Sequence, residues 1–261
     1  MYFDSHCHLD FPELIERLPG IRQEMRAAGV TAALCISTRL EDFERIHALA
    51  LQDDELWASV GVHPDNEGVT EPTVQDLVER AMRPRVVAIG ETGLDYYRLN
   101  GRSLDDMGWQ RERFRTHIRA ARQVGKPLVV HTRSSAADTL QILREENAAE
   151  VGGVMHCFTE TQEVAQAALA LDFHISFSGI LTFRNAADLR EVARLVPLER
   201  CLIETDSPYL APAPYRGKTN TPAYVPYVAA ELARIKGLPV EEVARQTTAN
   251  ARRLFGLDEI S

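Results

Sequence analysis

The sequence places metal-binding side chains at the ends of short apolar runs. Of its eight histidines, five lie at or just after the carboxyl end of such a run, namely His6, His8, His63, His131 and His156. Glu91 and Asp206 end two further runs of the same kind. Imidazoles mixed with carboxylates are typical ligands of divalent cations such as Zn²⁺, Mn²⁺, Co²⁺ and Ni²⁺. The pattern therefore predicts a metal site.

The spacing of these residues favours two metals rather than one. His6 and His8 are alternate residues of one predicted strand, so their side chains share a face, roughly 6.5–7 Å apart. Glu91 is costly to bury unless it is paired or metal-bound, and its two oxygens can bridge two cations. An arginine partner is the alternative for Glu91. His131 and His156 are ordinary core histidines when taken singly, but together they are candidate ligands of the second metal.

Three further residues complete this candidate site. Asp206 ends its run, and Glu204 has the same strand parity, so we expect Glu204 to hydrogen-bond a ligand unless it pairs with an arginine. His63, in Gly61-Val-His-Pro64, could be a ligand, but a contact with a substrate oxygen is favoured because the other residues already form a two-metal set. The remaining histidines are interpreted as structural: His47, His117 and His174.

Such a set indicates hydrolysis. Two cations about 4 Å apart can clamp an oxyanion and generate hydroxide at neutral pH. A non-catalytic metal-binding or scaffold protein stays open as an alternative.

The elements that must bring these residues together are strands alternating with helices. Strands are predicted at Tyr2–Cys7, Ala32–Ile36, Trp57–Val62, Val86–Glu91, Leu128–His131, Val154–Cys157, His174–Phe177 and Cys201–Asp206. Helical spacing of apolar residues is clearest over Met107–Val124, Ala136–Glu146 and Leu238–Phe255. Each βα unit then takes roughly 33 residues, which predicts an α/β protein with a single (β/α)₈ TIM barrel over residues 1–261.

In such a barrel the carboxyl ends of all strands meet at one mouth. An open doubly wound sheet is the alternative, but no G-x-G-x-x-G follows any strand. The segment Leu210–Thr221, rich in proline and glycine, is predicted to be an active-site loop.

Composition narrows the class of protein further. The chain has 261 residues, with 29 Lys plus Arg, 38 Asp plus Glu and a net charge of −9, so it lacks the global basic surface of a protein that coats duplex DNA or an acidic membrane. Its four cysteines form no CxxC pair, which favours the cytoplasm. No apolar run approaches the roughly 18 residues of a membrane span, and no obligatory protein partner is evident.

Several motifs together resemble one known family. They are Asp4-Ser-His-Cys-His-Leu-Asp10, Gly61-Val-His-Pro64, Ile89-Gly-Glu-Thr-Gly-Leu-Asp-Tyr96, His131-Thr-Arg133, His156-Cys-Phe158 and Glu204-Thr-Asp-Ser-Pro-Tyr-Leu210. In this order they resemble the TatD family of metal-dependent deoxyribonucleases. The resemblance implies an amidohydrolase-like TIM barrel of the metallo-dependent hydrolase type. It also implies divalent-metal-dependent hydrolysis of DNA, typically as a 3′→5′ exonuclease with some action on RNA.

Carried over by motif, the resemblance assigns roles to individual residues. It implies that His6, His8, Glu91 and Asp206 hold one cation and that Glu91, His131 and His156 hold the second. The identity of the metal stays open among Mg, Mn, Zn, Co and Ni. His63 would lie beside the scissile phosphate, and we expect Asp206 to act as both ligand and general base.

A nucleic acid substrate also needs cationic and aromatic groups near the site. Candidates for binding phosphate are Arg133, Arg216 and Lys218, with Arg98 and Arg102 nearby. Glu204 is also counted among the candidate substrate-binding residues. Tyr96, Tyr97 and Phe158 are candidates for stacking on unpaired bases. For each of these residues the alternative is a solvated charge or ordinary loop packing.

The nearest rival is a barrel amidohydrolase acting on a small amide, lactone or ester. Many of those enzymes bridge their metals with a carboxylated lysine. The chain has only three lysines, Lys126, Lys218 and Lys236, and none is positioned to replace Glu91.

Overall fold

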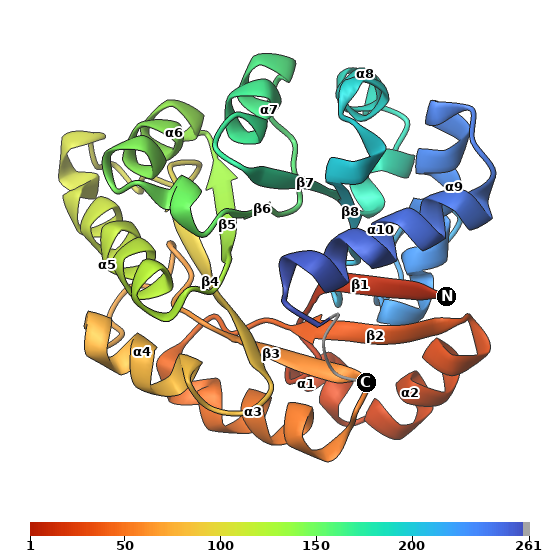
Figure 1. The fold of residues 1–261 in the computed structure, drawn as a ribbon, viewed down its shortest axis with the longest axis horizontal. Helices are drawn as coiled ribbons and strands as arrows, with labels where there is room; N and C mark the ends of the chain where they lie inside the picture. Colours follow the sequence, from red (N-terminus) through yellow and green to blue (C-terminus); the bar gives the residue numbers. More distant parts are fainter. Residues whose placement is uncertain (258–261) are drawn as a thin grey trace.

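Eight parallel strands alternate with helices in the computed structural model, which describes residues 1–257 (Figure 1). Of the predicted domain 1–261, residues 258–261 lie outside the described residues. The strands are β1 (Tyr2–Cys7), β2 (Val30–Cys35), β3 (Leu56–Val60), β4 (Val86–Asp95), β5 (Leu128–Arg133), β6 (Gly153–Met155), β7 (Phe173–Phe177) and β8 (Cys201–Ile203). They pair in the order of the sequence, each parallel to the next.

Helices surround the sheet on its outer side (Figure 1). They are α1 (Pro12–Ile15), α2 (Leu18–Ala27), α3 (Phe43–Gln52), α4 (Val74–Ala81), α5 (Gly108–Val124), α6 (Ala136–Glu145), α7 (Gln162–Leu169), α8 (Ala187–Leu195), α9 (Val225–Lys236) and α10 (Val240–Leu254). Short 3₁₀ segments lie at Leu40–Asp42, Asp105–Met107, Ala148–Glu150, Gly179–Thr182, Leu198–Arg200 and Pro222–Tyr224.

The three helices predicted from periodicity are present. In α5 the residues Phe114, His117, Ile118 and Ala121 are buried together, as their spacing of three and four predicts. The helix ends at Gly125, whose φ of 66° is the left-handed conformation that favours glycine at this position.

Backbone hydrogen bonds join the first strand to the segment after the last and close the barrel. The Asp206 amide donates to the His6 carbonyl at 2.9 Å, and the His8 amide donates to the Ser207 carbonyl at 2.9 Å. Figure 1 shows β1 beside β8 accordingly. The predicted (β/α)₈ TIM barrel is confirmed.

Some strand ends differ from the prediction. Strand β4 continues to Asp95, four residues past Glu91, whereas β6 ends before His156 and β8 ends before Asp206. After β8 the Thr205 amide donates to the buried carboxylate of Asp4 at 2.9 Å rather than to a neighbouring strand. A side chain thus takes the place of a ladder partner and ends the regular strand.

Within residues 1–257, no helix is both long enough and apolar enough to cross a lipid bilayer.

Candidate metal centre

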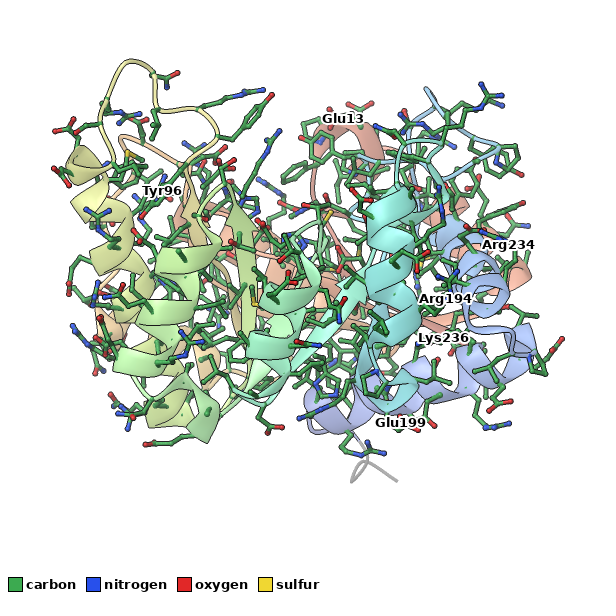
Figure 2. The ribbon with its side chains drawn as sticks, turned by 90° about the horizontal axis from the view of Figure 1, so that it is seen from above. Glu13, Tyr96, Arg194, Glu199, Arg234 and Lys236 are labelled. Atoms are coloured by element: carbon green, nitrogen blue, oxygen red, sulfur yellow. The ribbon has the colours of Figure 1, made fainter. Side chains whose placement is uncertain are left out.

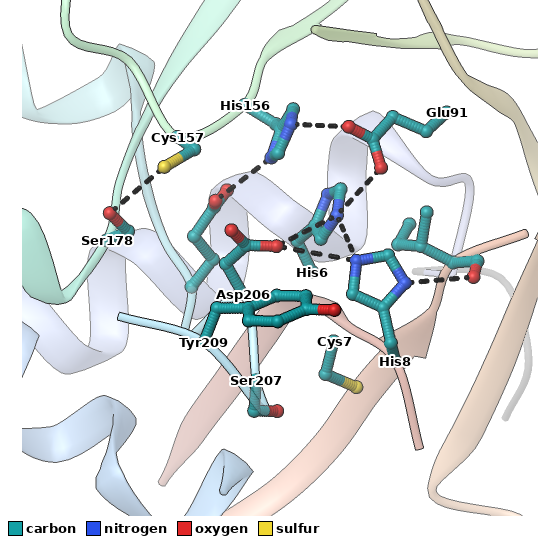
Figure 3. A network of polar contacts seen from close by, with 12 residues as sticks. His6, Cys7, His8, Glu91, His156, Cys157, Ser178, Asp206, Ser207 and Tyr209 are labelled. Atoms are coloured by element: carbon teal, nitrogen blue, oxygen red, sulfur yellow. Dashed lines mark hydrogen bonds and ion pairs between the residues drawn. The ribbon is translucent and has the colours of Figure 1, made fainter. Parts of the chain in front are cut away.

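The six predicted ligands meet at the carboxyl ends of the strands. His6 lies in β1 and His8 just after it; Glu91 lies in β4 and His131 in β5. The other two, His156 and Asp206, follow β6 and β8 directly. Figure 3 shows five of the six side chains pointing toward one another, and His131 lies 3.2 Å from Glu91 on the same side.

Four of these side chains form one group. The Nε2 atom of His6 lies 3.3 Å from Nε2 of His8, 3.4 Å from Oε2 of Glu91 and 3.6 Å from Oδ1 of Asp206. The His8 Nε2 to Asp206 Oδ1 distance is 3.4 Å. Ligand atoms of a tetrahedral cation with bonds near 2.0–2.1 Å lie roughly 3.3 Å apart. The separations therefore fit one shared cation.

The other oxygen of Glu91 faces a second group. Its Oε1 lies 2.8 Å from His156 Nε2, 3.2 Å from His131 Nδ1 and 3.3 Å from His63 Nε2. The His156 Nε2 atom is buried and makes no hydrogen bond among the described residues. Because Nδ1 of His156 pairs with Glu204, its Nε2 keeps a free lone pair, and that lone pair and the Glu91 oxygen would repel each other unless a cation lies between them. The residues therefore fit a second cation.

The structure differs from the expected division of ligands in one respect. His63 joins Glu91 and His131 in a candidate ligand group, whereas His156 also groups with His6 and Asp206. The His6 and His156 rings stack with their centroids 3.9 Å apart. His156 thus lies between the two groups, and His63 is near enough to Glu91 to serve either as a ligand or as a substrate contact.

The charges within this cluster compensate one another. Burial alone would raise the pKa of Glu91. The imidazoles of His156, His63 and His6 lower it by more than burial raises it, so the pKa of Glu91 lies well below its usual range. Burial lowers the pKa of His63, but Glu91 and Asp65 outweigh this and raise the pKa to about 10. Glu91 is accordingly the anion around which the imidazoles gather.

A further set of acceptors orients the imidazoles. The Nδ1 of His156 donates to Oε1 of the fully buried Glu204 at 3.1 Å, which agrees with the expectation that Glu204 binds a ligand. Asp95 Oδ2 lies 3.0 Å from His131 Nε2, and Asp65 Oδ1 lies 2.5 Å from His63 Nδ1. Such partners fix the ring orientation and raise its basicity.

Asp95 and Asp65 were not predicted. Asp95 comes four residues after Glu91 in β4, and side chains an even number of residues apart lie on the same face of a strand. The spacing would therefore identify Asp95 once β4 is known to extend that far. Asp65 lies two residues after His63 in a loop, where no periodic signal exists.

Hydroxyl groups of neighbouring strands hold the backbone around Glu91. The Glu91 amide donates to the Ser37 carbonyl at 2.9 Å, and the Ser59 hydroxyl donates to the Gly90 carbonyl at 2.6 Å. The Ser37 hydroxyl donates to the Gly61 carbonyl at 3.1 Å. These bonds fix the segment that carries the bridging carboxylate.

The candidate ligands open onto a cavity of about 930 Å³. Arg133 lines it, with its guanidinium 3.6 Å from the centre of the Tyr97 ring, and Arg98 and Arg102 line it as well. Arg102 is held by Glu67 at 2.6 Å. Arg133 and Arg98 therefore supply positive charge beside the metal centre.

The other predicted substrate contacts lie elsewhere. Tyr96 and Phe158 are 6% and 1% exposed, and the Tyr96 hydroxyl donates to Asp138, so neither ring offers a face for stacking. Arg216 packs on Phe183 at 3.5 Å, and Lys218 lies 5.6 Å from the Tyr215 ring; both are exposed and outside the cavity lining. The stacking prediction for Tyr96 and Phe158 is wrong because burial in loop packing removes both rings from the cavity.

None of the three lysines, all of which are described, reaches the centre. The Nζ of Lys126 donates to the Val86 carbonyl at 2.5 Å, and that of Lys236 donates to the Val196 carbonyl at 2.5 Å. In Figure 2, Lys236 lies far from Tyr96, which marks the loops at the carboxyl ends of the strands. A carboxylated lysine cannot bridge the metals here.

Comparisons with known proteins agree with this arrangement. The family model described as TatD related DNase matches residues 3–256. The uncharacterized metal-dependent hydrolase YcfH of Escherichia coli (strain K12) is 48% identical over 259 residues, covering 98% of this chain and 96% of YcfH. The 3′-5′ ssDNA/RNA exonuclease TatD of Escherichia fergusonii is 34% identical over 261 residues, covering 98% and 99%. The crystal structure of YjjV, a TatD homologue from E. coli K12, superposes with a TM-score of 0.90 at 28% identity, covering 98% of each chain.

Proposed function

The chain belongs to the TatD-related DNases and is a metal-dependent hydrolase of ester bonds, and from this premise we propose that it is an exonuclease that removes nucleotides from the 3′ end of single-stranded DNA, and of RNA. The proposal includes two divalent cations per chain. One observation carries it: the two oxygens of Glu91 face two different ligand groups in a cavity that Arg133 and Arg98 also line.

Each cation has a set of residues to hold it. We assign His6, His8, Glu91 and Asp206 to one cation, and Glu91, His131 and His156 to the other. When bound, such cations supply Lewis-acid stabilisation of charge on phosphate oxygens and lower the pKa of water.

The residues of the chain then divide the remaining work. Asp206, which lines the cavity, accepts the proton of the attacking water through its carboxylate. His63, oriented by Asp65, donates its Nε2 proton toward a non-bridging phosphate oxygen. Arg133 binds the next phosphate, and Tyr97 beneath its guanidinium limits the freedom of that side chain. Attack at phosphorus breaks the bond to the 3′ oxygen of the preceding nucleotide, which takes up the proton that Asp206 accepted and leaves as a 3′-hydroxyl, while the released nucleotide keeps a 5′-phosphate.

Cleavage of end-labelled oligonucleotides tests this proposal directly. Single-stranded DNA and RNA, labelled at the 5′ or the 3′ end, are incubated with the enzyme and Mg²⁺, Mn²⁺, Zn²⁺, Co²⁺ or Ni²⁺. We expect early release of a mononucleotide from the 3′ label and a descending ladder from the 5′ label. Chelator and the Glu91→Gln variant should abolish both.

The same assay separates the proposal from its rival. An absence of cleavage with every cation, together with turnover of a lactone or amide, would instead support an amidohydrolase. An initial ladder from the 3′ label would reverse the assigned polarity.

The cellular compartment is proposed on separate grounds. All four cysteines are free, and three of them are buried, so the fold depends on no disulfide. Such a protein suits the reducing cytoplasm, and we propose that location.

A further inference from the structure

One aromatic ring stands exposed beside the metal centre. Tyr209 follows Asp206 by three residues and is 52% exposed. Among the described residues, seven large apolar or aromatic side chains are at least this exposed, and Tyr209 is the one of these that lines the cavity containing the candidate ligands. Figure 3 shows its ring beside Asp206 and His8. Tyr209 thus offers an aromatic surface to whatever occupies this cavity.

The backbone under this ring is fixed. The Tyr209 amide donates to the Asp206 carbonyl at 3.0 Å. The side-chain nitrogen of the fully buried Asn220 donates to the carbonyls of Thr205 at 2.9 Å and Tyr209 at 2.6 Å. The loop that carries Tyr209 is thus tied to the segment that carries Asp206, so ring and ligand keep a constant relation.

A second ring supports the first from behind. Phe11 meets Tyr209 edge to face, with centroids 6.3 Å apart and planes at 78°. Phe11 in turn stacks on the metal-ligand candidate His8, with centroids 4.7 Å apart. Edge-to-face packing holds one edge of Tyr209 and leaves a face open. A continuous row of rings therefore runs from the metal centre to the cavity wall.

The cavity has different chemistry across the barrel. Arg133 ends β5 and Arg98 follows β4, whereas Phe11 and Tyr209 follow β1 and β8, which lie opposite in the strand order. One wall suits phosphates and the other suits a planar apolar surface. A nucleotide carries both, joined by a sugar.

We propose that Tyr209 is a base-stacking platform that binds the base of a nucleotide adjoining the scissile phosphate. Phe11 positions the platform, and Asn220 holds its backbone. This inference rests on the proposed nuclease function and adds the residue that recognises the base. Stacking tolerates any base, so the platform provides affinity for unpaired nucleotides without sequence preference.

Three variants test the platform in the full-length, metal-loaded enzyme. Tyr209→Leu removes the ring, Tyr209→Phe keeps it, and Tyr227→Leu removes an exposed tyrosine outside the cavity lining. On single-stranded DNA, Tyr209→Leu should raise KM by roughly 5- to 150-fold, the range for losing one stacked base. The kcat should change much less, and both other variants should match the wild type.

Substrates without a base identify the interaction. Two oligonucleotides carry an abasic residue at one or the other position flanking the scissile phosphate. We expect the KM difference between wild type and Tyr209→Leu to disappear on one of them. Thermal unfolding should be nearly the same for the wild type and both Tyr209 variants, because the Tyr209 ring is half-exposed.

The outcomes separate this inference from the nuclease proposal. If the wild type cleaves DNA and Tyr209→Leu has the same KM, the platform is refuted while the nuclease stands. A KM difference that persists on both abasic substrates also refutes it. If the wild type cleaves no oligonucleotide, both proposals fall together.

Discussion

Replacing Gly61 by alanine tests whether close contact between β3 and β4 positions the bridging carboxylate. A Cβ added at Gly61 would lie 2.4 Å from the carbonyl carbon of Gly90 and 2.7 Å from the carbonyl oxygen of Glu91. Because non-bonded carbons prefer about 3.5–4.0 Å, the two segments would have to separate by about 1 Å. Crowding of this kind costs about 1–3 kcal/mol of stability, and a shift of about 1 Å at a catalytic group can cost roughly 100-fold in turnover.

Urea unfolding and oligonucleotide turnover measure the two effects of Gly61→Ala. Gly20→Ala is the matched control, because Gly20 lies in α2 and its added Cβ would meet nothing within 4 Å. We expect that control to gain about 0.5–1 kcal/mol from its better helix propensity and to keep wild-type turnover. Wild-type stability and turnover in Gly61→Ala would refute the claim that this contact fixes Glu91.

Three other perturbations have defined outcomes. Glu204→Gln weakens the acceptor of the His156 Nδ1 proton and should lower metal affinity by roughly 10- to 100-fold in calorimetric titration, whereas Glu16→Gln, on an exposed residue, should not. Removing the cations should lower the unfolding free energy by about 2.7 kcal/mol for each cation relative to protein held at 100 times the dissociation constant of that site; a melting temperature insensitive to chelator would contradict cation binding to the folded chain. Burial lowers the pKa of His117 to about 4 from 6.5, so the folded state resists a proton that the unfolded chain accepts. The contribution of neutral His117 to the free energy of unfolding is then fully present above pH 6.5, and it decreases by about 3 kcal/mol as the pH falls to 4. His117→Gln should remove that part of the slope in urea unfolding at a series of pH values, and an unchanged slope would disprove it.

The sequence was sufficient to predict the barrel because its signals are periodic. Strand cores and helix faces repeat at fixed intervals, and the burial of Phe114 and Ile118 in α5 follows from that spacing. Strand ends were less predictable, because they depend on tertiary partners. The Thr205 amide turns to Asp4, about 200 residues earlier in the chain, and no local pattern announces that contact.

The candidate site divides in the same way. The convergence of the candidate ligands could be predicted because a parallel barrel brings all its strand ends to one mouth, where residues such as Glu91 and His156 meet. The aromatic contacts could not, because a loop ring lacks a period that fixes its direction. Tyr96 turns inward to Asp138, while Tyr209 turns outward. Only tertiary packing distinguishes the two.

Barrel closure and ligand placement depend on the same hydrogen bonds. The bonds from Asp206 to His6 and from His8 to Ser207 join the two ends of the sheet. They also fix the backbone of three candidate ligands of one cation. The Asp4 carboxylate adds to this seam by accepting from both the Thr205 amide and its hydroxyl. A cation held by His6, His8 and Asp206 would therefore crosslink the seam at which the barrel closes, which is why cation binding and stability should change together.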